Sequence, residues 1–161
     1  MPVTNVIKDA ENLQLTLVAE FDAPVERVWQ VFEDPRQLER WWGPPTWPAT
    51  FTEHEFTVGS MSKYHMTGPD GTKAAGWWII TSINEHSQFT FDDGFADSNG
   101  EPVDPDDKTS AVVSFETTAA GTQLTLQSTF RSAEQMEKMI NMGMVEGITL
   151  AMGQIDDILG S

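Results

Sequence analysis

Apolar and polar residues alternate with a period of two over residues 13–21, in the order Leu-Gln-Leu-Thr-Leu-Val-Ala-Glu-Phe. In a strand, successive side chains point to opposite faces, so this alternation predicts a strand with one buried face and one face in water. A strand of this kind belongs to an antiparallel sheet that has a core on one side only.

Two short helices are predicted after this strand. Pro24 suits the first turn of a helix, and the residues that follow place an apolar stripe on one side: Val25, Val28, Trp29 and Phe32. Asp34 and Pro35 then have the residue types of an N-cap and a first helical position. They predict a second helix, which ends before Gly43.

From residue 47 onward the period is two again. It predicts strands near residues 47–56, 59–68, 72–83, 87–92, 109–118 and 121–131. Residues 69–71 (Pro-Asp-Gly) and 119–121 (Ala-Ala-Gly) have turn sequences. Residues 93–107 are rich in glycine, proline and acid, which predicts a long surface loop. Consecutive strands with segregated helices indicate an antiparallel meander and an α+β fold.

The last segment, Ser132 to Leu159, is predicted to be one helix of seven turns. Ser132 suits an N-cap, and no proline interrupts the residues that follow. A helix of this length must lie across a wide surface, and the concave face of the sheet is the apolar surface that is large enough. One stripe of this helix is expected to face inward: Met136, Ile140, Gly143, Gly147, Ala151, Gln154 and Ile158.

Gly143 and Gly147 require an explanation, because each costs roughly 1 kcal/mol relative to alanine inside a helix. Glycine at such a position either lets another backbone approach or leaves empty space beneath the helix. Five methionines lie in the same segment, and methionine fills irregular volumes well. Two interpretations stay open here: a tightly packed core helix, or a helix that covers a cavity.

The composition of the chain excludes several classes of protein and partner. With 161 residues and 39% hydrophobic content, the chain is expected to form one domain over residues 1–161. It contains no apolar run long enough for a membrane span and no visible secretory signal. Cysteine is absent, which fits a cytoplasmic protein. The net charge of −16 argues against nucleic acid or an anionic membrane as a partner.

Several short motifs resemble one known family in their order and spacing. They are Ala23-Pro24-Val25-Glu26-Arg27-Val28-Trp29, then Pro35, Leu38 and Trp41-Trp42-Gly43-Pro44, Gly76-Trp77-Trp78, Asp93-Gly94-Phe95-Ala96-Asp97 with Gly100, and Met142-Gly143-Met144 with Glu146-Gly147. From about residue 12 to the C-terminus the chain is similar to the activator of heat-shock-protein ATPase homologue family. That family belongs to the START-like superfamily, also called SRPBCC or Bet v 1-like.

The resemblance implies a helix-grip fold: a seven-stranded antiparallel curved sheet around a long C-terminal helix, two short helices after the first strand, and a cavity between sheet and helix. It implies no single activity, because members include small-molecule carriers, cyclases, resistance proteins and co-chaperones. Relatives often carry an arginine and a Gly-Gly pair in the second hairpin, where this chain has Thr57 and Gly59-Ser60. A role of that arginine therefore does not carry over.

Aromatic residues are the strongest candidates for a ligand site. Six tryptophans include the pairs Trp41-Trp42 and Trp77-Trp78, and only one member of the second pair can face the interior of a sheet. Aromatic surface lines most small-molecule pockets, although the same rings also fill cores. The predicted ligand-binding residues are Trp41, Trp42, Tyr64, Trp78, Phe91, Met136, Ile140, Gly143, Met144 and Gly147.

Titratable residues give weaker signals. His54 and His65 fall on neighbouring predicted strands and could approach each other, but a solvated sheet face is the simpler interpretation. The acidic loop at 93–107 lacks the EF-hand register, because Phe95 stands where an acid is needed. We therefore predict no metal site and no cofactor.

Three functions are compatible with the sequence. The first is binding of a small apolar, aromatic or lipid-like ligand in the cavity. The second is a cyclase-, dehydratase- or hydrolase-like enzyme that uses Tyr64, His54 or His65 in that cavity. The third, suggested by the family name, is a chaperone-interaction module. The sequence leaves open whether the chain is an enzyme and whether it forms a homodimer.

Overall fold

The computed structural model describes residues 2–160, so the predicted domain limits extend one residue beyond it at each end. Within this range the chain forms one antiparallel sheet of eight strands in the order β1-β2-β8-β7-β6-β5-β4-β3. The strands are β1 Val3–Asp9, β2 Gln14–Phe21, β3 Ala49–Glu53, β4 Met61–Thr67, β5 Lys73–Asn84, β6 Gln88–Ala96, β7 Thr109–Thr117 and β8 Thr122–Thr129. The antiparallel meander and the α+β class are confirmed.

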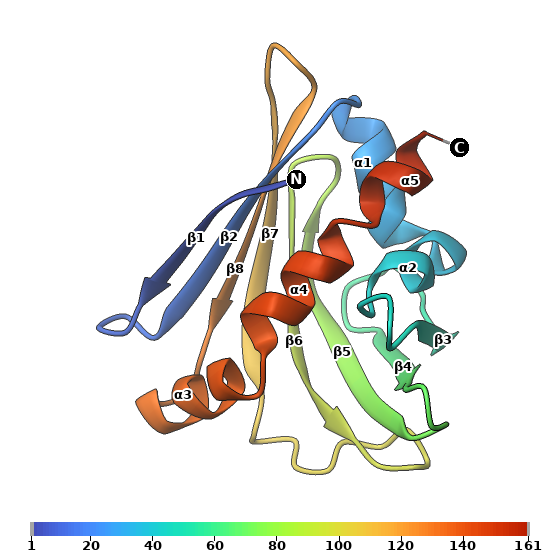
Figure 1. Cartoon of the computed structure of the whole chain (residues 1–161), viewed down its shortest axis with the longest axis vertical. Helices are drawn as coiled ribbons and strands as arrows, with labels where there is room; N and C mark the ends of the chain where they lie inside the picture. Colours follow the sequence, from blue (N-terminus) through green and yellow to red (C-terminus); the bar gives the residue numbers. More distant parts are fainter. Residues whose placement is uncertain (1, 161) are drawn as a thin grey trace.

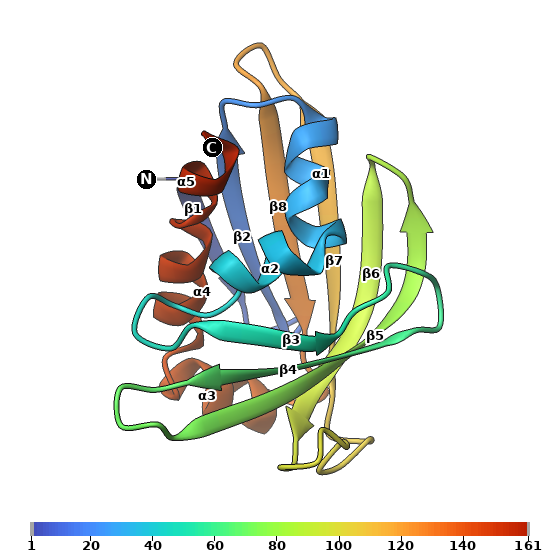
Figure 2. The ribbon, with the colours of Figure 1, turned by 90° about the vertical axis from the view of Figure 1, so that its right-hand side faces the viewer.

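Five helices cover the concave side of the sheet (Figures 1 and 2). They are α1 Val25–Glu33, α2 Pro35–Trp41, α3 Ala133–Asn141, α4 Met144–Met152 and α5 Ile155–Leu159. The first two begin as predicted: Asp34 accepts a hydrogen bond from the backbone N–H of Arg36 at 2.9 Å, with Pro35 at the first position of α2. The last three run as a chain of segments across the sheet (Figure 1).

The prediction of seven strands is wrong, because β1 was missed. Its residues, Val-Thr-Asn-Val-Ile-Lys-Asp, do not alternate in polarity, and none of them is fully buried. The strand forms because its backbone pairs with β2, from Asp9 opposite Gln14 to Val3 opposite Ala19. It is an edge strand that depends on ladder hydrogen bonds rather than on burial, so a search for periodic burial does not find it.

The predicted single C-terminal helix is also wrong. It breaks between α3 and α4, where Gly143 has a φ of +92° and forms the N-cap of α4. The Gly143 N–H donates to the Ile140 carbonyl at 3.0 Å, as glycine commonly does where a helix ends. A second, milder break follows at Gly153 and Gln154. The absence of proline is therefore not enough to predict a continuous helix, because a glycine in the left-handed conformation also ends α3.

The strand near residues 87–92 is longer than predicted. β6 continues to Ala96, so residues 93–96 belong to the sheet and not to the surface loop. Conversely, β3 ends at Glu53, three residues before the predicted end. Inward-facing residues of β2, β6, β7 and β8 form the core together with α1. Trp29, for example, meets Phe89 and Phe115 with ring centroids 5.7 and 5.1 Å apart.

Candidate functional site

Aromatic side chains from β3 to β6 and from the end of α2 meet on the concave face. Trp78 stacks on Phe91 with ring centroids 4.2 Å apart, and the edge of Trp42 meets Trp78 at 4.7 Å. Tyr64 stacks on Phe51 at 4.9 Å and lies 6.1 Å from Trp42. We call these five residues, together with Asp93 described below, the inner cluster.

The tryptophan pair of β5 divides as strand geometry requires. Trp78 is fully buried and faces the helices, whereas Trp77 lies on the outer face of the sheet, where its indole covers Gly94 of β6. Gly76 lies on the same face as Trp78, and the absence of a side chain there lets the Tyr64 phenol contact the backbone of β5. A Cβ atom at this position would collide with the phenol of Tyr64, its cross-strand partner. The glycine therefore makes room for the tyrosine side chain over β5.

Asp93 joins this cluster, although the sequence pattern was interpreted as a loop from residue 93 onward. It continues the inward alternation of Phe89 and Phe91 along β6 and lies between Trp78 of β5 and Thr109 of β7. The Thr109 hydroxyl donates a hydrogen bond to Asp93 Oδ1. No described lysine, arginine or histidine forms an ion pair with Asp93. The carboxyl group thus lies half-buried beside aromatic rings without a cation.

This environment changes the acidity of Asp93. Burial raises the pKa of Asp93 to about 6, and the nearby charge of Asp92 adds to the increase. The hydrogen bond from Thr109 opposes both effects, because it favours the ionised form. At neutral pH, Asp93 is therefore an ionised carboxylate that gains a proton at mildly acidic pH.

Tyr64 remains a neutral phenol. Burial raises the pKa of Tyr64, the negative charge of Asp93 raises it further, and the nearby Trp42 indole opposes these effects. The influence of Asp93 and Trp42 on one hydroxyl indicates that the three polar groups lie close together. Tyr64 can consequently donate a hydrogen bond to a ligand across the whole physiological pH range.

Two indole N–H groups of the cluster lack a partner. The Nε1 atoms of Trp42 and Trp78 are buried and have no hydrogen-bond partner among the described residues, and the same holds outside the cluster for Trp29 and Trp77. Trp41 differs: its Nε1 donates to the carbonyl of Val31 at 2.8 Å, and its ring packs on Phe32. Of the tryptophans predicted for the site, Trp41 therefore packs in the core, while Trp42 and Trp78 offer free donors.

The predicted helix residues have different surroundings. Met136 of α3 is buried, while Ile140 and Met144 are half-buried and pack against the core. At Gly147, an added Cβ atom would meet no other atom within 4 Å, so this glycine leaves open space and does not admit a second backbone. The side of α4 that packs inward is centred on Ile148 and Met152, with Gly147 at its edge.

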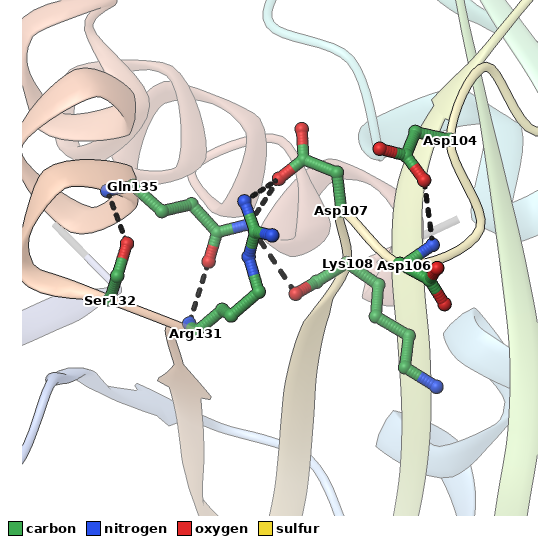
Figure 3. Close-up of polar contacts among 7 residues, drawn as sticks. All are labelled: Asp104, Asp106, Asp107, Lys108, Arg131, Ser132 and Gln135. Carbon is green, nitrogen blue, oxygen red and sulfur yellow. Dashed lines mark hydrogen bonds and ion pairs between the residues drawn. The ribbon is translucent and has the colours of Figure 1, made fainter.

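The first of the three C-terminal helices is attached at its N-terminus (Figure 3). Gln135, which is buried, accepts a hydrogen bond from the backbone N–H of Arg131 at 2.7 Å and donates to Asp107 Oδ1 at 3.0 Å. Arg131 also forms an ion pair with Asp107 at 3.0 Å, and Ser132 caps the helix by accepting from Gln135 N at 3.0 Å. These contacts fix α3 to the loop that precedes β7.

The far end of the helical segment is attached as well. Gln154 donates to the carbonyls of Gly43 at 2.7 Å and Trp41 at 3.3 Å, and Arg27 donates to the Ile158 carbonyl at 2.8 Å. Between these attachments, no side chain of α4 forms a hydrogen bond or ion pair with another described residue. Apolar packing alone therefore holds α4 over the sheet.

Two hollows lie at the surface around β3 and β4, and Tyr64 of the inner cluster borders the second. One, of about 370 Å³, is lined by Glu53, His54, Glu55, Ser60, Met61 and Lys63. The other, of about 480 Å³, lies mainly on the outer face between β3–β6 and the 97–100 loop, and His65 lines it. Neither is the predicted cavity beneath the C-terminal helices.

The histidines do not form a metal site. The ring of His54 bonds the Ser62 hydroxyl through Nδ1 at 2.7 Å and the Phe32 carbonyl through Nε2 at 2.9 Å. His65 points to the outer face, and the described part of the chain holds no group of three histidine, aspartate or glutamate side chains suited to a metal ion. Across residues 2–160, no helix has the length and apolar character needed to cross a bilayer.

Asp93 is the site residue that sequence reasoning missed. A signal was available, because Phe89, Phe91 and Asp93 keep one period-two series and Gly94 supplies the space that the Trp77 indole requires. The acid-rich sequence that follows concealed this continuation.

Comparison with known proteins supports the fold. A structure of a protein from Arthrobacter aurescens shares 58% identity and a TM-score of 0.93, over 98% of this chain and 92% of that one. Protein Ms6760 from Mycobacterium smegmatis shares 46% identity and a TM-score of 0.91, over 99% and 98%. The AHSA1 protein SPO3351 from Silicibacter pomeroyi, at 18% identity and a TM-score of 0.72 over 91% and 97%, is similar in fold alone.

No curated protein matches the chain. A family model does: the one described as Activator of Hsp90 ATPase homolog 1-like protein matches residues 22–160. This match covers most of the sequence, from just before α1 to α5, and leaves out β1 and β2. The chain therefore belongs to the Activator of Hsp90 ATPase homolog 1-like family, within the SRPBCC or Bet v 1-like superfamily.

Proposed function

We propose that this protein binds a small apolar or aromatic ligand between the concave face of the sheet and helices α3 and α4. The observation that carries this proposal is the inner cluster, which places Asp93 and the unpaired indole N–H groups of Trp42 and Trp78 among aromatic rings. Unpaired indole N–H groups also occur at Trp29 and Trp77, outside the cluster, so the feature specific to the cluster is the combination of two such donors with a carboxyl group that has no cation. A few polar groups in an apolar surround are the usual composition of a ligand site.

The attachment of the helices supports the same proposal. Hydrogen bonds hold the start of α3 and the residues around α5, while α4 is held by apolar packing alone. Gly143 provides a flexible joint where α4 begins. Movement of α4 away from the sheet would expose the inner cluster without breaking a side-chain hydrogen bond. The superfamily fold, whose members commonly bind hydrophobic ligands, agrees with this arrangement.

The proposed ligand contacts come from two sides. Trp42, Tyr64, Trp78 and Phe91 contribute aromatic surface from the sheet side, with Asp93 as the added polar group. From the helices, the contacts are Met136, Ile140, Met144 and Gly147, which are buried, half-buried or beside open space. Trp41 and Gly143 act indirectly, through core packing and through the helix joint.

Thermal unfolding against a panel of lipids and polycyclic aromatic compounds tests the proposal. A ligand present at about one hundred times its dissociation constant stabilises the folded state by roughly 2.7 kcal/mol. For a domain of this size, that raises the unfolding midpoint by about 5–10 °C. A panel in which no compound raises the midpoint contradicts the proposal.

A matched pair of variants locates the site. Met144→Trp adds bulk at a half-buried position that packs against the core, whereas Leu150→Trp adds the same bulk at an exposed position of the same helix, where Leu150 is 55% accessible. We expect the first variant to lose the ligand-induced shift and the second to keep it. If the ligand raises the unfolding midpoint equally in both variants, it does not bind beneath α4.

A second candidate function is catalysis at the same site, favoured by one observation. An Asp93 carboxyl with a pKa of about 6 beside a neutral Tyr64 phenol is a pair suited to moving a proton near neutral pH. Incubation of any compound that binds, followed by chromatography, tests turnover. If the wild type converts the compound and Asp93→Asn does not, the protein is an enzyme.

The chaperone-interaction role, the homodimer and the cytoplasmic location stay predictions. Co-purification with the chaperone of the host tests the first, and sedimentation velocity tests the second. Neither measurement depends on ligand binding.

A further inference from the structure

The polar groups of the inner cluster define what kind of ligand group they can bind. Thr109 donates to one oxygen of Asp93, Oδ1, and no described residue donates to the other. The cluster therefore presents one free carboxylate oxygen, which accepts hydrogen bonds. Beside it are the donors: the indole N–H groups of Trp42 and Trp78 and the hydroxyl of Tyr64.

These groups belong to neighbouring residues of the inner cluster. Asp93 and Trp78 are direct cross-strand neighbours in the pairing of β5 with β6. The Trp42 ring lies 4.7 Å from Trp78 and 6.1 Å from Tyr64, measured between ring centroids. The residues that carry the acceptor and the donors are thus neighbours, with the stacked rings of Trp78 and Phe91 among them.

Ligand groups differ in how well they satisfy this set. An ammonium group donates to the carboxylate but leaves the indole N–H groups unpaired. A carboxylate accepts from the indoles but is repelled by Asp93. An ether or ketone accepts a hydrogen bond from an indole N–H but has no hydrogen to donate to the carboxylate. A hydroxyl group donates one hydrogen bond and accepts others, so it can satisfy both sides at once.

We propose that the inner cluster selects apolar ligands that carry a hydroxyl group, phenols and alcohols, with the hydroxyl donating to Asp93 and accepting from Trp42, Trp78 or Tyr64. This inference rests on the proposed function and adds the chemical class of the ligand. The aromatic rings hold the apolar body, and the hydroxyl sets its orientation. Hydrogen bonds to charged groups are the stronger ones, so Asp93 decides the selectivity.

Four naphthalene probes test the inference: 2-naphthol, 2-methoxynaphthalene, 2-acetylnaphthalene and 2-(aminomethyl)naphthalene. They share one apolar body and differ in the polar group. We expect the wild type to bind 2-naphthol about tenfold or more tightly than the other three, as measured by calorimetry. The preference should fall to less than about threefold in Asp93→Val, which is similar in size and suits a strand but removes the acceptor.

Neighbouring variants make the test specific. Asp93→Asn retains the shape and an acceptor for Thr109 without the charge, and should show an intermediate preference even if Asp93→Val folds poorly. Asp92→Asn removes the adjacent charge on the outer face, where Asp92 contacts Lys108 and Ser110, and should keep the full preference. Loss of the preference in Asp92→Asn would mean that general charge, not the site, is responsible, and would overturn the inference.

The outcomes separate the two proposals. If the wild type binds all four probes equally, or binds the amine most tightly, the hydroxyl inference is wrong while ligand binding stands. If none of the probes binds and the broader panel also gives no thermal shift, the proposed function fails and the inference fails with it.

Discussion

Asp92 and Asp93 are adjacent in the chain but have opposite surroundings on the two faces of β6. Asp92 lies on the outer face, 3.2 Å from the Lys108 ammonium, and accepts a hydrogen bond from the Ser110 hydroxyl at 2.8 Å. Asp93 faces the aromatic rings of the concave side and accepts from Thr109, without a cation nearby. Asp92 therefore makes a partly exposed ion pair, whereas Asp93 lies half-buried in the inner cluster. Because the two are neighbours in the chain, a substitution at one is a control for the same substitution at the other.

We expect Asp93→Asn to stabilise the protein at neutral pH. The pKa of Asp93 is about 6 in the folded protein against an ordinary value of 3.8, so ionisation favours the unfolded state. The difference corresponds to at most about 3 kcal/mol above pH 6, and partial solvent screening reduces it to roughly 1–2 kcal/mol. The gain should shrink as the pH falls below 6 and vanish below about pH 4, as measured by urea unfolding.

The corresponding control is Asp92→Asn. Its ion pair with Lys108 is partly exposed, with side-chain accessibilities of 21% for Asp92 and 47% for Lys108, and exposed pairs contribute at most about 1 kcal/mol. We expect a small loss of stability at pH 7 in place of a gain. If Asp93→Asn also loses stability at pH 7, the carboxylate is better accommodated by the fold than its surroundings indicate, and Asp93 would not be a residue kept for function at a cost in stability.

The order of elements could be predicted because most of them carry a periodic burial pattern. The sequence shows the inward series of β2 through Leu15 and Leu17, and the capped start of α2 through Asp34 and Pro35. Most predicted strands from β4 onward agree with the structure within two residues at each end, apart from the C-terminal end of β6. The family resemblance confirmed the order but gave the wrong number of strands.

The missed features have different physical causes. β1 is held by backbone pairing with little burial, and backbone pairing leaves no periodic signal. The break at Gly143 depends on a φ of +92°, which glycine permits but does not require. The unpaired N–H groups of Trp42 and Trp78 result from packing between distant segments, so only the three-dimensional structure distinguishes them from Trp41.

Gln135 is expected to hold α3 in place through the contacts drawn in Figure 3. Its side chain accepts from Arg131 N at 2.7 Å and donates to Asp107 at 3.0 Å, in a buried position. Gln135→Leu leaves the Arg131 N–H without this partner, and we expect a loss of about 1–3 kcal/mol in unfolding free energy. Hydrogen exchange of the α3 amides should become faster. Replacement of the exposed Glu134 by leucine should change neither, and equal effects of both would refute the role of Gln135.

Protonation of His54 is expected to destabilise the fold. Burial lowers the pKa of His54, although the Phe32 carbonyl and the charge of Asp34 oppose this effect. The neutral ring is therefore preferred in the folded state, and the unfolded chain binds the proton more readily. Stability should be complete above the ordinary pKa of about 6.5 and fall below it, by up to about 1.4 kcal/mol per pH unit.

The comparison of His54→Gln with His65→Gln isolates this contribution. A glutamine at residue 54 can still reach Ser62 or Phe32 but does not titrate, so the dependence of unfolding free energy on pH between 7 and 5 should become flatter. His65 lines the hollow on the outer face, and its replacement should leave the His54 contribution in place. If the unfolding free energy of His54→Gln depends on pH as steeply as that of the wild type, a group other than His54 causes the loss of stability in acid.

Gly143 and Gly147 lie one turn apart and should respond in opposite ways to alanine. Gly143 has a φ of +92°, a conformation that costs an L-residue about 1–2 kcal/mol, so Gly143→Ala should destabilise the protein by that amount. Gly147 lies inside α4 with open space around its α-carbon, and alanine there should stabilise by up to about 1 kcal/mol. Urea unfolding of both variants measures the two changes. If the substitutions have the same sign, α3 and α4 form the continuous helix that the sequence pattern alone predicts, and Gly143 is not the joint on which movement of α4 depends.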